Sequence, residues 1–263
     1  MHAFAALAVP ENNVAIHWFG QNSFAIKDSA GTLFLVDPYF PRERPAEVFI
    51  HPTPPLDEAE LEPHFVLLTH DHGDHTHPET LLRIHAAFPQ TLYYGPVESM
   101  ARLQNLGIPA SQLCALRAGD IQQAASVTLH AMYSKPPQGV PAEGIPAPDV
   151  THLGYGIEAG RARLYISGDL IYSFARHAEL MNPVLQFKPG VGLLTTHPTE
   201  GEFPDFAGSV EMAVKLGLKT AIPAHYDCFV QRTFDPALWA AGFAPQGPQP
   251  VLIGYNQFIL YKG

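Results

Sequence analysis

Three histidines and two aspartates lie within six consecutive residues of this chain, in the segment HDHGDH at residues 70–75. The segment directly follows an apolar run, residues 65–69, whose length and β-branched and aromatic content predict a buried strand. Imidazole nitrogens and carboxylate oxygens are ligands that zinc, iron and manganese accept. Because a loop at a strand end can direct several side chains to one point, we expect a metal site here, with four candidate ligands: His70, His72, Asp74 and His75.

Further ligands should lie at other strand ends, because a metal site draws side chains from several elements. A predicted strand at residues 162–167 runs into Gly168-Asp169, and another at residues 220–224 runs into His225. Taken alone, the first fits a common turn and the second fits a structural histidine. Next to the histidine segment, Asp169 and His225 become candidate ligands.

Composition narrows the setting of this site. The chain has 263 residues, of which 46% are hydrophobic and 15% charged, as in a compact globular protein. Its net charge of −10 argues against nucleic-acid binding but leaves room for a small anionic substrate held by local basic residues. Basic candidates for that contact are Arg42, Arg44, Lys135, Arg176 and Arg232, and an apolar wall could come from Tyr39, Phe40, His197 and Phe229.

The chain also carries signals about its surroundings. Two cysteines offer no disulfide framework, which favours a reducing cytoplasm. The first ten residues lack the basic start of a secretory signal, and no segment approaches 18 apolar residues, so we expect no membrane association. The sequence leaves open whether the chain forms homo-oligomers.

The elements that must position these residues can be read along the chain. A β-meander is expected over the first 40 residues, and no repeat or break in composition divides residues 1–263, so one domain is predicted. Residues 135–150, rich in proline and glycine, form either a disordered linker or an ordered active-site loop. Further strands are expected at 91–94, 113–116, 125–132, 153–158 and 191–196, helices at 78–85, 97–106 and 205–216, and a terminal strand pair at 251–254 and 257–261.

In the order and spacing of these motifs, the chain resembles the metallo-β-lactamase fold superfamily. That pattern is a strand ending in His-x-His-x-Asp-His, then a later strand-end histidine, then a Gly-Asp and then a final strand-end histidine. The resemblance runs from about Trp18 to Asp227. Within the superfamily the chain looks most like the ascorbate-6-phosphate lactonases and related metal-dependent hydrolases. The shared motifs are Trp18-Phe19-Gly20-x-x-Ser23-Phe24, Leu35-Val36-Asp37-Pro38, Tyr165-x-Ser167-Gly168-Asp169 and Ile222-Pro223-x-His225-Tyr226-Asp227.

The resemblance implies an α/β fold, an αββα sandwich of two mixed β-sheets flanked by helices, with a dinuclear metal site. His70 and His72 would bind the first ion, with Asp169 bridging to the second. Asp37 would orient a ligand imidazole, as metal-bound histidine usually requires, or would instead form a turn before Pro38. The second ion would be bound by Asp74, His75 and His225.

One histidine of the pattern is missing. It should follow the strand at 125–132, where this chain has Tyr133. A phenol has a pKa near 10, so it ligates a metal only when another group helps to deprotonate it. Tyr133 is therefore expected to donate a hydrogen bond to substrate or to pack as an aromatic. His130 lies at an odd offset on the same strand and should face the other way. For His152, we expect a surface histidine at a strand start, with a replacement ligand as the alternative.

The chemistry follows from these ligands. One or two divalent ions, zinc or manganese first and iron next, would activate water as hydroxide, with Asp74 orienting it and carrying its proton. The predicted function is therefore hydrolysis of a small ester, lactone or phosphoester. Two alternatives remain: a mononuclear iron dioxygenase, which the missing histidine disfavours, and a relative that has lost catalysis and only binds.

Overall fold

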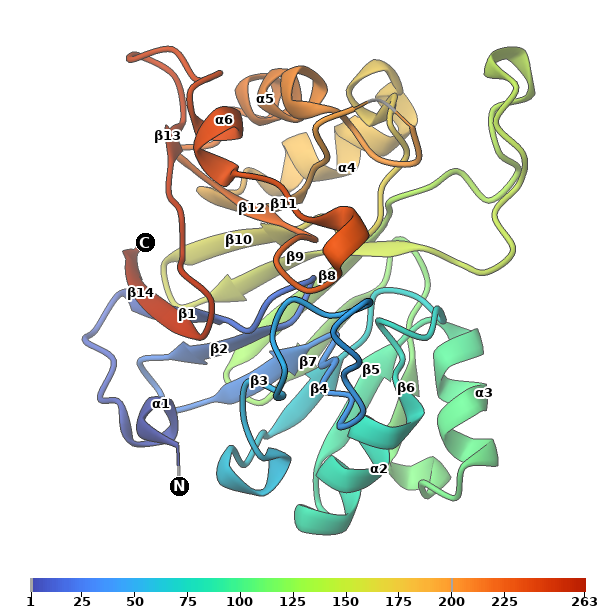
Figure 1. The fold of residues 1–263 in the computed structure, drawn as a ribbon, viewed down its shortest axis with the longest axis vertical. Coiled ribbons are helices and arrows are strands. Elements are labelled where there is room, and N and C mark those ends of the chain that lie inside the picture. Colours follow the sequence, from blue (N-terminus) through green and yellow to red (C-terminus); the bar gives the residue numbers. More distant parts are fainter. Residues whose placement is uncertain (1, 200) are drawn as a thin grey trace.

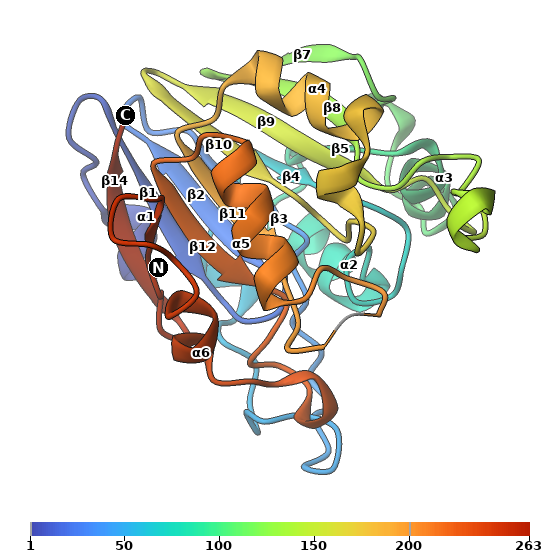
Figure 2. The same cartoon turned by 90° about the horizontal axis from the view of Figure 1, so that it is seen from above.

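Two seven-stranded β-sheets pack face to face, and helices cover the outer face of each (Figures 1 and 2). A computed structural model describes residues 2–199 and 201–263. Both sheets mix parallel and antiparallel pairs, which confirms the expected αββα sandwich. The strand orders are β14-β1-β2-β3-β4-β5-β6 and β13-β12-β11-β10-β9-β8-β7.

The first sheet comes from the N-terminal half of the chain, completed by the last strand. Helix α2 (Pro78–Ala87) covers its outer face through Leu81 and Ile84. Proline suits the first helical position because its missing N–H needs no partner there, and His77 caps the helix by accepting from Thr80 N. The other elements are β1 (Asn13–Trp18), β2 (Phe24–Asp28), β3 (Leu33–Val36), β4 (Phe65–Leu67), β5 (Leu92–Gly95), β6 (Leu113–Ala115), β14 (Gln257–Lys262), α1 (Ala3–Ala6) and α3 (Val97–Asn105).

The second sheet carries its own helical layer. Helix α5 (Phe206–Lys215) begins at Asp205, whose carboxylate accepts from Gly208 N at 2.7 Å. The other elements are β7 (Ile121–Ala124), β8 (Val127–Tyr133), β9 (Leu153–Ala159), β10 (Ala162–Ile166), β11 (Val191–Thr195), β12 (Thr220–Ala224), β13 (Gln249–Pro250), α4 (Ala178–Phe187) and α6 (Pro236–Ala240). Five short 3₁₀ turns complete the described chain: Glu58–Glu60, Ala110–Gln112, Pro141–Glu143, Phe174–Arg176 and Val230–Arg232.

A continuous apolar core fills the space between the sheets. The first sheet contributes Trp18, Phe34 and Phe65, and the rings of the last two stack with centroids 4.6 Å apart. The second sheet contributes Tyr155 and Leu164 to the same core. Because both halves of the chain share this core, we propose that residues 1–263 form one domain.

The strand directions bring several chain segments to one edge of the sandwich. Strands β3 and β4 run parallel, as do β10, β11 and β12, so each group presents its carboxyl ends together. Strand β9 is antiparallel to β10, and its first residue therefore lies beside the end of β10. The loop after β4, the turn after β10 and the residue after β12 all leave from this edge, which makes it the place where ligands from distant segments can meet.

Three expectations about elements were wrong, each for a physical reason. The last residues do not form a strand pair: residues 251–254 form no strand, β13 ends at Pro250 and joins β12, and β14 joins β1 in the other sheet. The strand expected at 125–132 begins with a turn, because Ala125 has φ of 51° and closes the β7–β8 hairpin. Helix α4 was missed because Pro183 lies inside it, and proline normally ends a helix.

No described helix is longer than ten residues, about half of what a bilayer crossing requires.

Candidate metal centre

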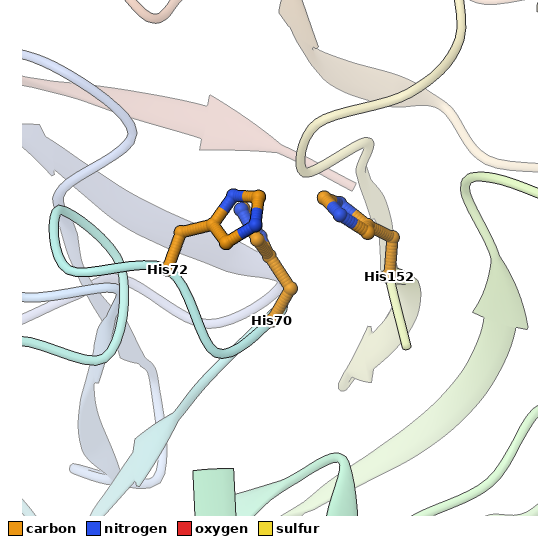
Figure 3. Close-up of side chains that lie close together, drawn as sticks. All are labelled: His70, His72 and His152. Atoms are coloured by element: carbon orange, nitrogen blue, oxygen red, sulfur yellow. The ribbon is translucent and has the colours of Figure 1, made fainter. Parts of the chain in front are cut away.

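The structure brings seven histidine and aspartate side chains together at this edge, in three overlapping groups whose ligand atoms lie within 4.8 Å of one another. Six of them are the ligands predicted from the sequence, and the seventh is His152. Figure 3 shows His70 and His72 facing His152 across a shared space, from the loop after β4 and from the start of β9. The groups are His70, His72 and His152; His70, His75 and Asp169; and Asp74, His75 and His225.

A tight turn after β4 sets the direction of the histidine segment. The N–H groups of His75 and Thr76 both donate to the carbonyl of His72, at 3.0 and 2.8 Å. The Thr76 hydroxyl donates to the carbonyl of His70 at 2.8 Å. Because these bonds fold the backbone back on itself, side chains from both ends of the six-residue segment reach the same space.

Asp169 reaches the centre because a glycine precedes it. Gly168 has φ of +55°, and a Cβ at this position would lie 2.8 Å from the carbonyl oxygen of Leu153 and 3.0 Å from Cβ of Thr69. Any larger residue would therefore push the β10 end away from β4 and β9. Asp169 itself is buried, between the histidines of the two other groups.

The distances around Asp169 match those between ligands of a shared ion. Its Oδ1 lies 3.3 Å from His225 Nε2, and its Oδ2 lies 3.4 Å from His75 Nε2 and 3.6 Å from His70 Nε2. Two ligand atoms of a tetrahedral zinc ion, each ~2.0–2.1 Å from the metal, lie about 3.3 Å apart. The distances from the Asp169 oxygens to the three histidine nitrogens therefore fit ligands that share a metal ion.

The same groups contain buried polar atoms that no described residue satisfies. These atoms are Nε2 of His70 and His75, Oδ1 of Asp169, and both ring nitrogens of His152. Buried polar groups normally find a partner, so a cluster of unsatisfied nitrogens and an oxygen fits a bound cation. The set of imidazoles and carboxylates, without thiolate, suits zinc, manganese or iron.

Asp37 holds one of these imidazoles in place. Its Oδ2 accepts from His75 Nδ1 at 2.7 Å and from the Thr69 hydroxyl at 2.6 Å. Its Oδ1 accepts from Thr69 N at 2.8 Å, and Asn22 Nδ2 donates to Oδ2 at 2.7 Å. With Nδ1 fixed by the carboxylate, the other ring nitrogen of His75 points toward Asp169 and Asp74. This is the orienting position that the sequence resemblance implied for Asp37.

The surroundings shift the pKa values of the candidate ligands in different directions. Burial and the neighbouring His75 hold the pKa of His70 well below its usual range, and burial and Lys135 lower the pKa of His152 to about 3. Both imidazoles are therefore neutral at pH 7, the form that binds metal. Burial would also lower the pKa of His75, but the carboxylates of Asp169, Asp74 and Asp37 raise it well above its usual range. His75 thus carries a positive charge that a cation would replace.

Comparison with known proteins agrees with this geometry. A family model described as "Beta-lactamase superfamily domain" matches residues 32–226, the span that holds every group above. The chain belongs to the metallo-β-lactamase superfamily. A "UPF0173 metal-dependent hydrolase" from Pyrobaculum neutrophilum is 25% identical over 224 residues, which cover 84% of this chain and 88% of that protein.

Solved structures of the superfamily show the same fold at lower identity. Igni18, described as a novel metallo hydrolase from Ignicoccus hospitalis, is 17% identical with a TM-score of 0.69, over 95% of this chain and 99% of that one. An isothiocyanate hydrolase from Delia radicum gut bacteria is 14% identical with a TM-score of 0.73, over 94% and 99%. The expected superfamily is confirmed, whereas the closer likeness to ascorbate-6-phosphate lactonases stays a prediction.

His152, the alternative ligand from the start of β9, is the residue that joins His70 and His72, although the missing histidine was expected after the strand at 125–132. The expectation of a surface histidine was wrong, because His152 is only 1% exposed and its ring stacks on His70 with centroids 4.1 Å apart. The end of β8 pairs with the start of β9, and Ser134 N donates to the carbonyl of His152 at 3.1 Å. His152 therefore lies opposite Ser134, the residue after β8, whereas Tyr133 pairs with Leu153.

Tyr133 lies elsewhere. It packs against the apolar clusters on both faces of the second sheet and lines a cavity of about 470 Å³ with His130 and Phe187. Among the described residues, Tyr133 is in the wall of neither cavity beside the histidines. These contacts match the expected packed aromatic.

The residues expected to form an apolar wall lie in different places. His197 is half-buried and its ring contacts Thr199, outside the three groups. Phe40 is fully buried in the core beneath α2, so the expectation that it lines the site was wrong. Phe229 does line the larger cavity. The proline-rich loop folds back through a bridge between Val140 and Ile145 and lines a cavity with His72 and His152, as an active-site loop would.

Sequence reasoning missed residues that the structure places against the ligands. Gln21, in the β1–β2 turn, donates from Nε2 to Asp74 Oδ2 at 2.7 Å and lies 2.9 Å from His225 Nε2. Its φ of 53°, like 40° at Asp37 and 70° at His225, is a strained backbone typical of functional sites. Asp149, from the proline-rich loop, lies 3.1 Å from His72 Nε2. The run Gln-Asn-Ser between two apolar strands was the available signal for Gln21.

Proposed function

We propose that this protein is a metal-dependent hydrolase that binds two divalent ions. The observation that carries the proposal is the pair of three-ligand groups on either side of Asp169, with unsatisfied buried atoms in both. The names of the Pyrobaculum and Ignicoccus relatives support the same reaction class. The substrate class, a small ester, lactone or phosphoester, is part of the proposal.

The two groups divide the ligands between them. His70, His72 and His152 would hold one ion, Asp74, His75 and His225 the other, and Asp169 would contact both. Ions bound by these residues would supply hydroxide near neutral pH and would polarise the oxygen of a carbonyl or phosphoryl group. Zinc and manganese fit this ligand set best, and iron fits it also.

The chain's own side chains complete the chemistry. Asp74 borders the larger cavity, of about 610 Å³, where it can accept the proton of the attacking water at a carboxylate oxygen. Gln21 fixes Asp74 through its amide N–H, and Asp37 fixes His75 through Nδ1. These two contacts keep the base and the ligand imidazole from rotating when substrate enters.

The cavity sizes support a small substrate. The larger cavity and a second one, of about 530 Å³, are both lined by His72 and Glu202. Together they offer separate room for the acyl or phosphoryl part of a substrate and for its leaving group.

The alternatives have less support. A mononuclear iron dioxygenase needs one complete site, whereas the described residues form three overlapping groups of three ligands each. A relative that has lost catalysis would have no reason to keep Asp74 fixed by Gln21 beside a cavity.

Metal content and turnover of the purified protein test the proposal. We expect about two equivalents of zinc or manganese by elemental analysis, and hydrolysis of a lactone, ester or phosphodiester panel that chelation abolishes and added metal restores. His72→Ala and Asp74→Ala should each lose activity. His85→Ala, which removes a half-buried histidine on α2 outside the site, is the matched control. Full activity in both site variants, or hydrolysis that survives complete chelation, would refute the mechanism.

A further inference from the structure

Two cavities share one charged wall beside the metal ligands. The larger contains His72, Asp74 and Arg232, and the smaller contains His72, His152 and Lys135. Glu202 lines both of them. Among the described residues, His72 and Glu202 are the two that line both cavities, so the Glu202 carboxylate lies where the cavities adjoin.

The Glu202 carboxylate lies between two cations. Its Oε1 is 3.2 Å from Lys135 Nζ, and its Oε2 is 3.8 Å from a terminal nitrogen of Arg232. The Arg232 guanidinium also lies over the ring of Phe203, 5.7 Å from its centroid. Among the described residues, these are the only ion pairs that either cation forms, and Lys135 and Arg232 are the only lysine and arginine in the walls of the two cavities.

The three side chains differ in how easily they can leave this arrangement. The Lys135 side chain is only 12% exposed, whereas Glu202 is 45% exposed. Glu202 can therefore swing into water at little cost, while Lys135 without an anion would be a largely buried, unpaired charge. The Arg232 side chain is 46% exposed, about as much as Glu202, so Lys135 is the fixed member of the three.

Other basic side chains near the site are already engaged elsewhere. Arg42 forms ion pairs with Asp57 and Glu58, and Arg44 donates to the carbonyl of His51 at 2.8 Å. Neither lines the two cavities that meet at His72. Of the five basic candidates in the sequence, only Lys135 and Arg232 are in those walls.

We propose that Lys135 and Arg232 bind a carboxylate or phosphate group of the substrate, in the position that the Glu202 carboxylate holds in this structure. Glu202 occupies the site until an anionic substrate displaces it. The inference rests on the proposed hydrolase site, because it makes the pair a specificity determinant for that site. A neutral ester would reach the metal ligands without using it.

Calorimetric titration of succinate and of inorganic phosphate into the zinc-loaded protein tests the anion site without turnover. Lys135→Met and Arg232→Met should each weaken binding on the order of tenfold, the usual loss of a hydrogen bond to a charged group. Glu202→Gln should strengthen binding several-fold, because it removes the competing anion. Arg176→Met removes an exposed cation and is the control for overall charge. Preference for succinate or for phosphate identifies which anion the site recognises.

The opposite results overturn the inference. It is contradicted if the wild type binds neither anion, or if Glu202→Gln binds more weakly. Equal affinities in all variants would also contradict it, because the anion would then contact only metal. Turnover separates this failure from that of the hydrolase proposal. With 4-nitrophenyl succinate and its methyl-capped ester, the two cation variants should raise KM about tenfold for the free acid only. If neither ester nor any phosphoester is hydrolysed while the calorimetry holds, the hydrolase proposal fails and the anion site stands.

Discussion

Replacement of His152 by alanine should remove one of two bound ions. The three-histidine group would keep only His70 and His72, whereas Asp74, His75 and His225 would be untouched. Loss of a residue that merely orients a ligand costs about 10–100-fold in metal affinity. Loss of one of three imidazole ligands should cost at least the upper end of that range, about 2.7 kcal/mol or more.

The assay is zinc competition against a chromogenic chelator, with cobalt absorption as a second readout of coordination. The wild type should bind two equivalents, and His152→Ala should bind one tightly and one more than about 100-fold more weakly. Retention of the second equivalent also shows that the variant is folded. Tyr133→Phe is the matched control, because the superfamily pattern points to this position but the structure does not, and it should change neither affinity by more than about twofold.

Two results would refute the reasoning. If His152→Ala keeps both ions at wild-type affinity, the buried stacking of His152 on His70 is structural and not ligation. If Tyr133→Phe loses an ion instead, the phenol of Tyr133 is the ligand, and not His152.

Three further perturbations test the surrounding structure. Asp37→Asn should lower the metal affinity of the His75 group by about 10–100-fold in the same competition assay, and unchanged affinity would contradict an orienting role. Burial lowers the pKa of His17 from 6.5 to about 4. The unfolded chain therefore gains a proton between pH 6.5 and 4 that the folded protein excludes, and stability present above pH 6.5 falls by up to about 3 kcal/mol as the pH drops. In urea unfolding, the free energy of unfolding of His17→Phe should fall by about 3 kcal/mol less over this pH range, and an equal pH slope would be inconsistent with the burial effect. Gly168→Ala should destabilise the fold more than the control Gly217→Ala, because Gly217 also has a positive φ, of 65°, but has open space around it. The control should cost about 1 kcal/mol, and equal losses in thermal unfolding would mean that the contact with Leu153 is unimportant.

Much of the fold was predictable because the signals are local. Apolar runs bounded by glycine and proline predicted most strands, and Pro78 and Gly217 marked the start of one helix and the end of another. The failures came where a neighbour overrides a local signal. Helix α4 tolerates Pro183 because its face packs against the second sheet, and β14 pairs with β1, which lies more than two hundred residues earlier. No window of sequence contains either contact.

The sequence by itself determined the ligand types and six of the candidate ligands, because a strand end followed by histidine and aspartate is a local feature of the chain. The spacing of these motifs also determined the superfamily. Only the tertiary structure decided that His152 completes the three-histidine group, that Gln21 holds Asp74, and that Glu202 lies between Lys135 and Arg232. Each of these contacts joins segments that are distant in sequence and are brought together by strand pairing and loop packing. The residue types alone therefore do not show which partner each side chain contacts.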